Sequence, residues 1–223
     1  MNRVAACRER GLSLLLTLLL CAATPTVSKA RDAGGGEGGD LAPLASSPAA
    51  EAAEAGGVED GIALKLAHGP SGMAIEGRFT TAASPSIVWS VLTDYDSIAR
   101  FVTSMRSSHV VGRSNDTLFV DQQAVGRLLL FSHRLHTSLR IEEDPQAHIR
   151  FEDLLGRDFK SYRGEWRIEP SKSAGATVIY RLQADPSFPI PDMIARGLFR
   201  KTARELLSQV RTEIERRAAL AAK

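Results

Sequence analysis

The feature that most constrains the fold is a series of alternating segments that ends in one long amphipathic stretch. Apolar and polar residues alternate with a period of two at 108–113, 117–125, 128–141, 148–155, 164–168 and 177–182. Such alternation is typical of strands with one buried face. From Pro191 to about Arg217 the apolar residues recur at spacings of three and four, which predicts a long helix. Its apolar stripe must be buried, and a twisted antiparallel sheet offers a face of matching length.

Ahead of these segments the sequence predicts a hairpin and two short helices. Residues 62–66 and 73–79 alternate on either side of a Gly-Pro-Ser-Gly turn. Ser84 and Pro85 open a helix with proline at its first position, and a second short helix follows over 95–101. We therefore expect an α+β fold, in which a curved antiparallel sheet of six to seven strands carries two short helices and the long helix crosses its concave face.

The first thirty residues have the order of an export signal. Arginines come first, residues 12–23 are mostly apolar, and small residues follow. The apolar core is too short for a comfortable membrane span, which favours a cleaved signal over an uncleaved anchor. Leu20 stands where a small residue normally precedes a lipidated cysteine, so lipoprotein anchoring at Cys21 is disfavoured. We expect a signal peptide over 1–30 and a secreted or periplasmic protein.

Residues 31–60 are mostly Gly, Ala, Pro, Ser and acidic residues, with almost no large apolar side chain. Such a segment cannot repay its ordering entropy, so we expect a disordered linker and a folded domain over 61–223. Its glycine run has no strand before it and no apolar helix after it, which excludes a phosphate loop. Cys7 and Cys21 are the only cysteines, so the mature chain has neither a disulfide nor a thiol nucleophile.

Charge and hydropathy exclude two classes of protein. The formal net charge of the 223 residues is +2, and the folded part is only mildly basic. It lacks the dense Lys and Arg runs of a strong nucleic-acid binder, so we expect no nucleic-acid partner. No apolar run reaches the roughly 18 residues that a membrane-spanning helix needs, which excludes a polytopic membrane protein.

Several motifs resemble one known superfamily. They are Ala-Ser-Pro-Ser-Ile-Val-Trp-Ser-Val-Leu-Thr-Asp-Tyr-Asp at 83–96, the segments 164–168 and 177–182, and Phe-Pro-Ile-Pro at 188–191. Together they resemble the helix-grip (SRPBCC) superfamily of START, birch-pollen-allergen and polyketide cyclase proteins over roughly 62–217. The resemblance is to the polyketide cyclase/dehydrase branch, which includes coenzyme Q-binding START-like proteins. It implies a cavity between the sheet and the last helix that holds a lipid, a quinone or a polyketide-like aromatic.

Strand parity selects candidate ligand-binding residues. In 128–141 the odd positions carry the apolar side chains and should face the concavity, together with His133 and Thr137. These two could hydrogen-bond a quinone oxygen, a sterol hydroxyl or a lipid head. The more common alternative is that His133 lies near the rim, satisfied by water or backbone. The full candidate set is Phe101, Phe131, His133, Leu135, Thr137, Phe151, Trp166, Tyr180, Ile194, Leu198 and Phe199. For Trp166 the safer expectation is a core position.

Catalysis has weaker support in the sequence. There is no Gly-x-Ser-x-Gly motif, and no pair of histidines has metal-ligand spacing, so we expect no catalytic nucleophile, metal or cofactor. Acid–base chemistry would need His133, Asp121 or Asp153 in a pocket, and the two aspartates are expected to point outward. We predict a non-catalytic binding protein. The alternatives are an aromatase/cyclase-like enzyme, which export disfavours, and an interaction module with a filled core.

The last helix carries two further features. Arg196, Arg200 and Arg204 form one stripe with Lys201 beside it. Such a stripe could make transient contact with an anionic membrane surface, although a solubilising face is the more common use of helix charges. Gly197 interrupts the helix, which either lets a ligand or strand lie close or is tolerated variation.

Overall fold

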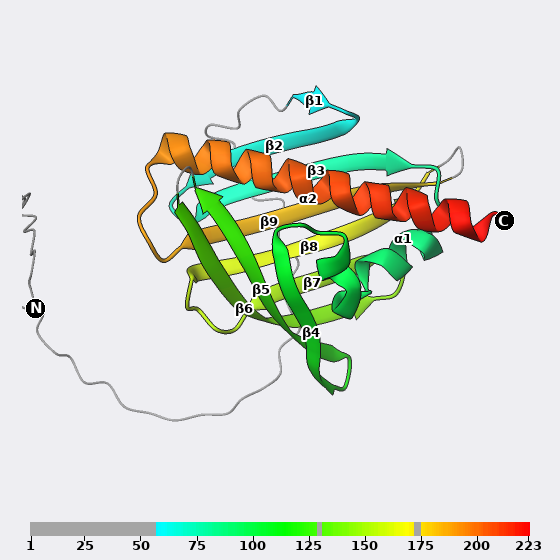
Figure 1. Ribbon diagram of the computed structural model, residues 1–223, viewed down its shortest axis with the longest axis horizontal. Helices are drawn as coiled ribbons and strands as arrows, with labels where there is room; N and C mark the ends of the chain where they lie inside the picture. Colours follow the sequence, from blue (N-terminus) through cyan, green and yellow to red (C-terminus); the bar gives the residue numbers. More distant parts are fainter. Residues whose placement is uncertain (1–56, 129–130, 172–174) are drawn as a thin grey trace, which may run out of the picture. The chain divides into compact units, whose positions relative to one another are not determined.

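The structure is a computed structural model that describes residues 57–128, 131–171 and 175–223. The expected signal peptide and all of the expected linker up to residue 56 lie outside these ranges. The described elements follow the predicted order, ending in one long helix (Figure 1). They are β1 (Val58–Glu59), β2 (Ile62–Gly69), β3 (Gly72–Thr81), α1 (Pro85–Leu92), the 3-10 helix η1 (Tyr95–Arg100), β4 (Met105–Ser114), β5 (Thr117–Leu128), β6 (Phe131–Asp144), β7 (His148–Asp153), β8 (Phe159–Pro170), β9 (Ala176–Pro186) and α2 (Asp192–Ala221).

One antiparallel sheet contains every described strand, in the order β1-β2-β3-β9-β8-β7-β6-β5-β4. The predicted helix-grip α+β class is confirmed, but the sheet has nine strands within the described ranges, more than the six to seven expected. Part of the difference is β1, which is only two residues long and so shows no alternation. A turn at Asp60 and Gly61, both with positive φ, folds it onto β2, so the sheet begins within the last residues of the expected linker.

Helix α2 packs on the inner face of the sheet over β2 and β3 and also contacts α1 (Figure 1). The helix lies very close to the sheet at Gly77 of β3, where any Cβ would collide with the side chain of Leu207. Leu207 is fully buried, so the missing side chain at residue 77 determines how closely the helix lies on the strand. The sheet and helix thereby enclose one apolar core.

The two short helices lie where the sequence predicts them. The Ser84 side chain caps α1 by accepting a hydrogen bond from the Ile87 N–H, with Pro85 at the first position. Arg217 ties the end of α2 to this region, because it donates to the Asp94 carboxylate at 2.7 Å and to the Ser90 carbonyl at 3.0 Å. The end of the fold at which α2 finishes is therefore closed by α1 and η1.

The outer face of the sheet carries charge rather than apolar surface. One row of cross-strand neighbours alternates between positive and negative charge. It crosses six adjacent strands in the order β2, β3, β9, β8, β7 and β6, with the residues Lys65, Glu76, Arg181, Glu165, Arg150 and Glu142. Arg181 donates to Glu76 and to the buried Glu165, each at 2.9 Å. Opposite charges on adjacent strands stabilise a sheet. An apolar ligand would therefore find its surface on the inner face. Within the described residues, no helix is both long and apolar enough to span a membrane.

Candidate functional site

The inner face of β6 follows the predicted parity. Thr137, Leu139 and Ile141 are buried, whereas the His133 side chain, near the start of the strand, is 55% exposed. The structure thus places Thr137 inside and His133 at the rim, which was the alternative considered for it. The Phe131 side chain lies outside the described residues.

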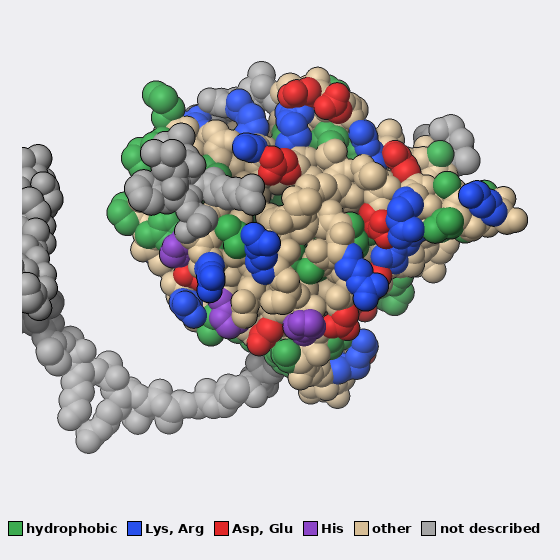
Figure 2. All heavy atoms as spheres, in the orientation of Figure 1, with side chains coloured by type: hydrophobic (Ala, Val, Ile, Leu, Met, Phe, Trp, Pro, Cys, Tyr) green, Lys and Arg blue, Asp and Glu red, His purple; other side chains and the backbone are tan. Residues whose placement is uncertain are grey.

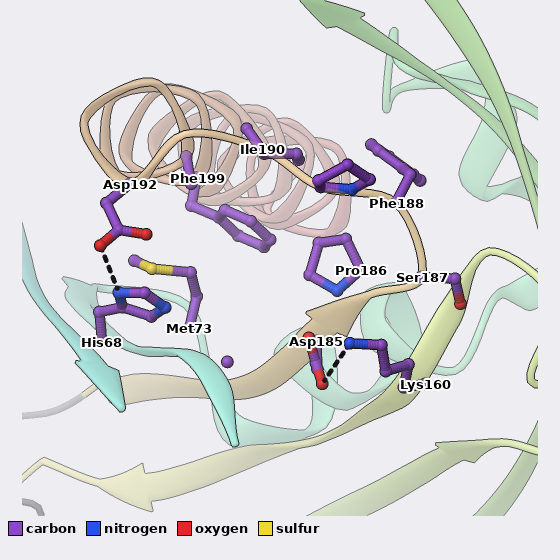
Figure 3. A pocket seen from close by; sticks show the side chains of 13 residues that line it. His68, Met73, Lys160, Asp185, Pro186, Ser187, Phe188, Ile190, Asp192 and Phe199 are labelled. Carbon is purple, nitrogen blue, oxygen red and sulfur yellow. Dashed lines mark ion pairs between the residues drawn. The ribbon is translucent and has the colours of Figure 1, made fainter. Parts of the chain in front are cut away.

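A cavity of about 320 Å³ opens at the end of the fold where α2 begins (Figure 3). Met73, Phe188, Ile190 and Phe199 supply its apolar lining. Its volume lies at the lower end of the range for small-molecule sites. In Figure 2 hydrophobic side chains gather around this start of α2, with histidine and basic side chains beside them.

Two ion pairs stand at the edge of this cavity (Figure 3). His68 Nδ1 of β2 lies 3.5 Å from Asp192 Oδ2 in the first turn of α2. Lys160 Nζ of β8 lies 3.6 Å from Asp185 Oδ2 of β9. Both pairs are partly solvated, so each contributes little to stability. They make the mouth polar while the lining behind it is apolar.

Asp158 organises the opposite side of the mouth. Its buried carboxylate accepts from the His136 backbone N–H at 2.8 Å and lies 3.4 Å from His133 Nε2. Its carbonyl accepts from the Ser187 N–H at 3.0 Å. The His133 ring in turn packs on Phe188, with ring centroids 4.9 Å apart. The end of β6 and the segment before α2 are therefore held together across the mouth.

Aromatic side chains of β7, β8 and β9 pack on one another along the inner face. The ring centroids of Phe151 and Tyr180 are 6.5 Å apart, and those of Trp166 and Tyr180 are 4.5 Å apart. Burial raises the pKa of Tyr162 and of Tyr180 above the ordinary tyrosine value. Phe151, Trp166 and Tyr180 were candidate ligand residues, and the structure places all three in this aromatic cluster. Whether a ligand also reaches them stays a prediction.

Other inward-facing apolar residues are only half-buried. Among them are Leu135 of β6, Tyr162 of β8, and Phe199 and Leu206 of α2, all packed against the core. Ala124 of β5 is also partly exposed, although β5 lies between β4 and β6. Its exposure must come from the inner face, because a central strand has no open edge. Helix α2 therefore leaves part of the inner face of β5 and β6 uncovered.

The remaining candidates lie at two places. Ile194 and Leu198 are half-buried on the first turns of α2, near Phe199, which lines the cavity. Phe101 follows η1 and packs against the core there. Among the predicted ligand residues whose side chains the structure describes, only Phe199 lines the cavity. The sequence interpretation missed His68, Lys160, Asp185 and Asp192; nothing in their local pattern marks them, because distant turns bring them together.

The two aspartates considered for acid–base chemistry have other partners. Asp121 Oδ1 accepts from the Ser138 hydroxyl at 2.7 Å on the outer face, as the outward expectation had it. The Asp153 carboxylate accepts from the backbone N–H groups of Ser138, Leu155 and Gly156 at 2.9 to 3.1 Å. Asp153 pairs with the inward Leu139, so the expectation that it points outward is wrong, but these N–H groups already occupy its carboxylate where β7 ends. No group of His, Cys, Asp and Glu in the described part of the chain is arranged to hold a metal.

The other features of α2 are also placed. Gly197 is exposed, and a Cβ there would meet nothing within 4 Å, so it permits no close approach within the described structure. Arg204 pairs with Glu59 of β1 at 3.1 Å, and Lys201 lies 3.9 Å from Glu205. The basic stripe is therefore partly engaged within the protein.

Comparison with known proteins gives one family and many similar folds. The sequence pattern of the family described as polyketide cyclase/dehydrase and lipid transport matches residues 81–211, more than half of the chain. No curated protein matches the chain.

Three solved structures illustrate the fold similarity. A STAR-related lipid transfer protein from Xanthomonas axonopodis is 16% identical, with a TM-score of 0.58 over 70% of this chain and 95% of that one. The Zhui aromatase/cyclase from Streptomyces sp. R1128 is 17% identical, with a TM-score of 0.56 over 65% and 94%. Human StAR-related lipid transfer protein 5 is 7% identical, with a TM-score of 0.58 over 71% and 84%. At such identities the likeness concerns the fold alone.

Proposed function

Since the chain belongs to the polyketide cyclase/dehydrase and lipid transport family, we propose that it binds and carries a hydrophobic small molecule between the sheet and α2. A lipid, a quinone and a polyketide-like aromatic are the ligand classes considered. The N-terminal sequence pattern supports a site of action outside the cytoplasm, in the periplasm or after secretion.

One observation carries the proposal: apolar side chains on the inner face stay half-buried, and one of them, Phe199, lines an open cavity. A folded protein gains about 25 cal/mol for each Å² of apolar surface that it removes from water. Leu135, Phe199 and Leu206 forgo part of this gain, and an apolar ligand that covers them would supply it. The filled-core alternative predicts instead that these side chains are fully buried.

The enzymatic alternative has less support. Neither Asp121 nor Asp153 has a carboxylate that faces an apolar pocket without a partner. His133 lies at the rim, where water competes for any proton it would transfer. The Zhui protein is an aromatase/cyclase by name, but the likeness to it is in the fold.

Binding of N-phenyl-1-naphthylamine, a neutral apolar fluorophore, tests the proposal. We expect its emission to rise on titration into the full folded domain. Ala195 is buried in the cavity wall, so Ala195→Phe should weaken binding about ten-fold by occupying the space. Met193 lies two residues away on α2 and is 86% exposed, so Met193→Phe is the matched control and should bind normally. Absence of binding, or equal binding by the two variants, would contradict the proposal.

A further inference from the structure

A polar row crosses the otherwise apolar inner face of β4, β5 and β6. Ser108, Gln122 and Thr137 are direct cross-strand neighbours on these strands, and all three face inward. The neighbouring row toward the mouth is Ala124 and Leu135, and the row on the far side is Val120 and Leu139. The three polar side chains therefore form one polar row between two apolar rows on the inner face of the sheet.

The hydrogen bonds within this row are incomplete. Gln122 Nε2 donates to Ser108 Oγ at 3.2 Å, which leaves the amide oxygen and the second amide hydrogen of Gln122 available. Thr137 is 8% exposed, and no hydrogen bond joins its hydroxyl to another described residue, but the oxygen is not among the fully buried polar atoms that lack a partner. The Thr137 hydroxyl therefore keeps some accessible surface on the inner face, where it can donate to or accept from a ligand oxygen.

The row has no charge to offer. The inward positions of β5, β6, β7 and β9 carry neither Lys nor Arg in the described part of the chain, and Lys160 of β8 lies at the edge of the cavity, paired with Asp185. The inward acids are already engaged: Glu143 accepts from the Tyr95 hydroxyl at 2.6 Å, and Asp153 accepts from backbone N–H groups. A carboxylate or phosphate brought to this depth would remain unneutralised, at a large cost.

Given the proposed ligand-binding function, we infer that Gln122 and Thr137 anchor a neutral oxygen, a carbonyl or a hydroxyl, at the inner end of an apolar ligand. The oxygen lies innermost, and Ala124 and Leu135, in the next row toward the mouth, contact the apolar body of the ligand. Thr137 is four residues beyond His133 along β6, so the anchor lies about 13 Å inside the rim. The ligand class is therefore a neutral lipophilic ketone, quinone or alcohol rather than a fatty acid or a phospholipid.

Four ten-carbon probes separate this inference from the proposed function: decane, decan-2-one, decan-1-ol and decanoate. Each is titrated against wild-type protein loaded with N-phenyl-1-naphthylamine. We expect the ketone and the alcohol to displace the fluorophore at about ten-fold lower concentration than decanoate. Thr137→Val and Gln122→Leu should each weaken ketone and alcohol binding about five-fold while leaving decane unchanged. Gln123→Leu changes the exposed neighbour on the outer face and should have no effect.

The outcomes are distinguishable. If neither the fluorophore nor any probe binds, the proposed function is wrong, and so is the inference that Gln122 and Thr137 bind a ligand oxygen. If the probes bind but decanoate competes as well as the alcohol, or if neither inward variant changes ketone and alcohol binding, the anchor is overturned and the proposed function stands. The comparison of decanoate with decan-2-one and decan-1-ol uses wild-type protein alone, so it tests the preference for a neutral ligand even if a variant does not fold.

Discussion

Replacing Gly77 by alanine should destabilise the protein although alanine suits a strand better than glycine. The new Cβ would lie well inside contact distance of Leu207 Cδ1 and 3.1 Å from Leu64 Cδ2, and both leucines are buried. Overpacking of this kind costs about 1–3 kcal/mol, whereas relief from glycine alone would stabilise by about 0.5–1 kcal/mol. We expect a net loss of about 1–2 kcal/mol in the free energy of unfolding.

A double-mutant cycle measures the contact between residues 77 and 207. Leu207→Ala should cost about 2–5 kcal/mol because it leaves a cavity under α2. In the double variant the methyl group added at position 77 occupies part of that cavity, so the two losses should fall short of additivity by at least about 1 kcal/mol. Urea unfolding of the four proteins measures these free energies. Gly197→Ala, with open space around residue 197, is the control and should stabilise by up to about 1 kcal/mol. Additivity, or a stabilised Gly77→Ala protein, would refute the contact as described.

Three further predictions concern charge and ionisation. Arg181→Met should lower the free energy of unfolding by about 1–3 kcal/mol in urea, because it leaves the buried Glu165 without its 2.9 Å partner; no change would contradict the pairing. Hydrogen bonds from Arg216 and Arg217 lower the pKa of the Glu213 carboxyl from 4.5 to about 2. The ionised carboxylate should therefore stabilise the fold fully above pH 4.5 and lose this effect as the pH falls toward 2. Thermal melts should show Glu213→Gln to be less acid-sensitive than wild type over that window. Burial raises the pKa of all three tyrosines, so phenolate absorbance in alkali should appear only as the protein unfolds. A phenolate signal near pH 10 in the folded protein would contradict this prediction.

The order of elements could be predicted because each carries a local signal. Ser84 and Pro85 marked the start of α1, and the odd positions of β6 marked its inner face. The same local reasoning undercounted the strands, since β1 is too short for alternation and depends on its pairing with β2. The composition of residues 31–60 predicted a flexible linker, but its last three residues form β1 and the start of the turn that follows it.

The site depended on information that no local pattern contains. The cavity wall combines β2, β3, β8, β9 and α2, which are far apart in the sequence and are brought together by the strand order of the sheet. The polar row needs the exact register of β4 on β5, and a β-bulge near Met105 shifts that register. Thr137 could be predicted to face inward by parity, but its neighbour Gln122 could not be recognised without the pairing of the strands.

The most direct test of a ligand between sheet and helix is native mass spectrometry of the protein purified from its own source. We predict a population heavier than the bare chain by the mass of one small molecule. Denaturation should release that molecule into a solvent extract as a neutral, apolar compound that contains oxygen. A single mass equal to that of the bare chain, with an extract free of lipids, quinones and aromatics, would contradict a ligand-carrying role.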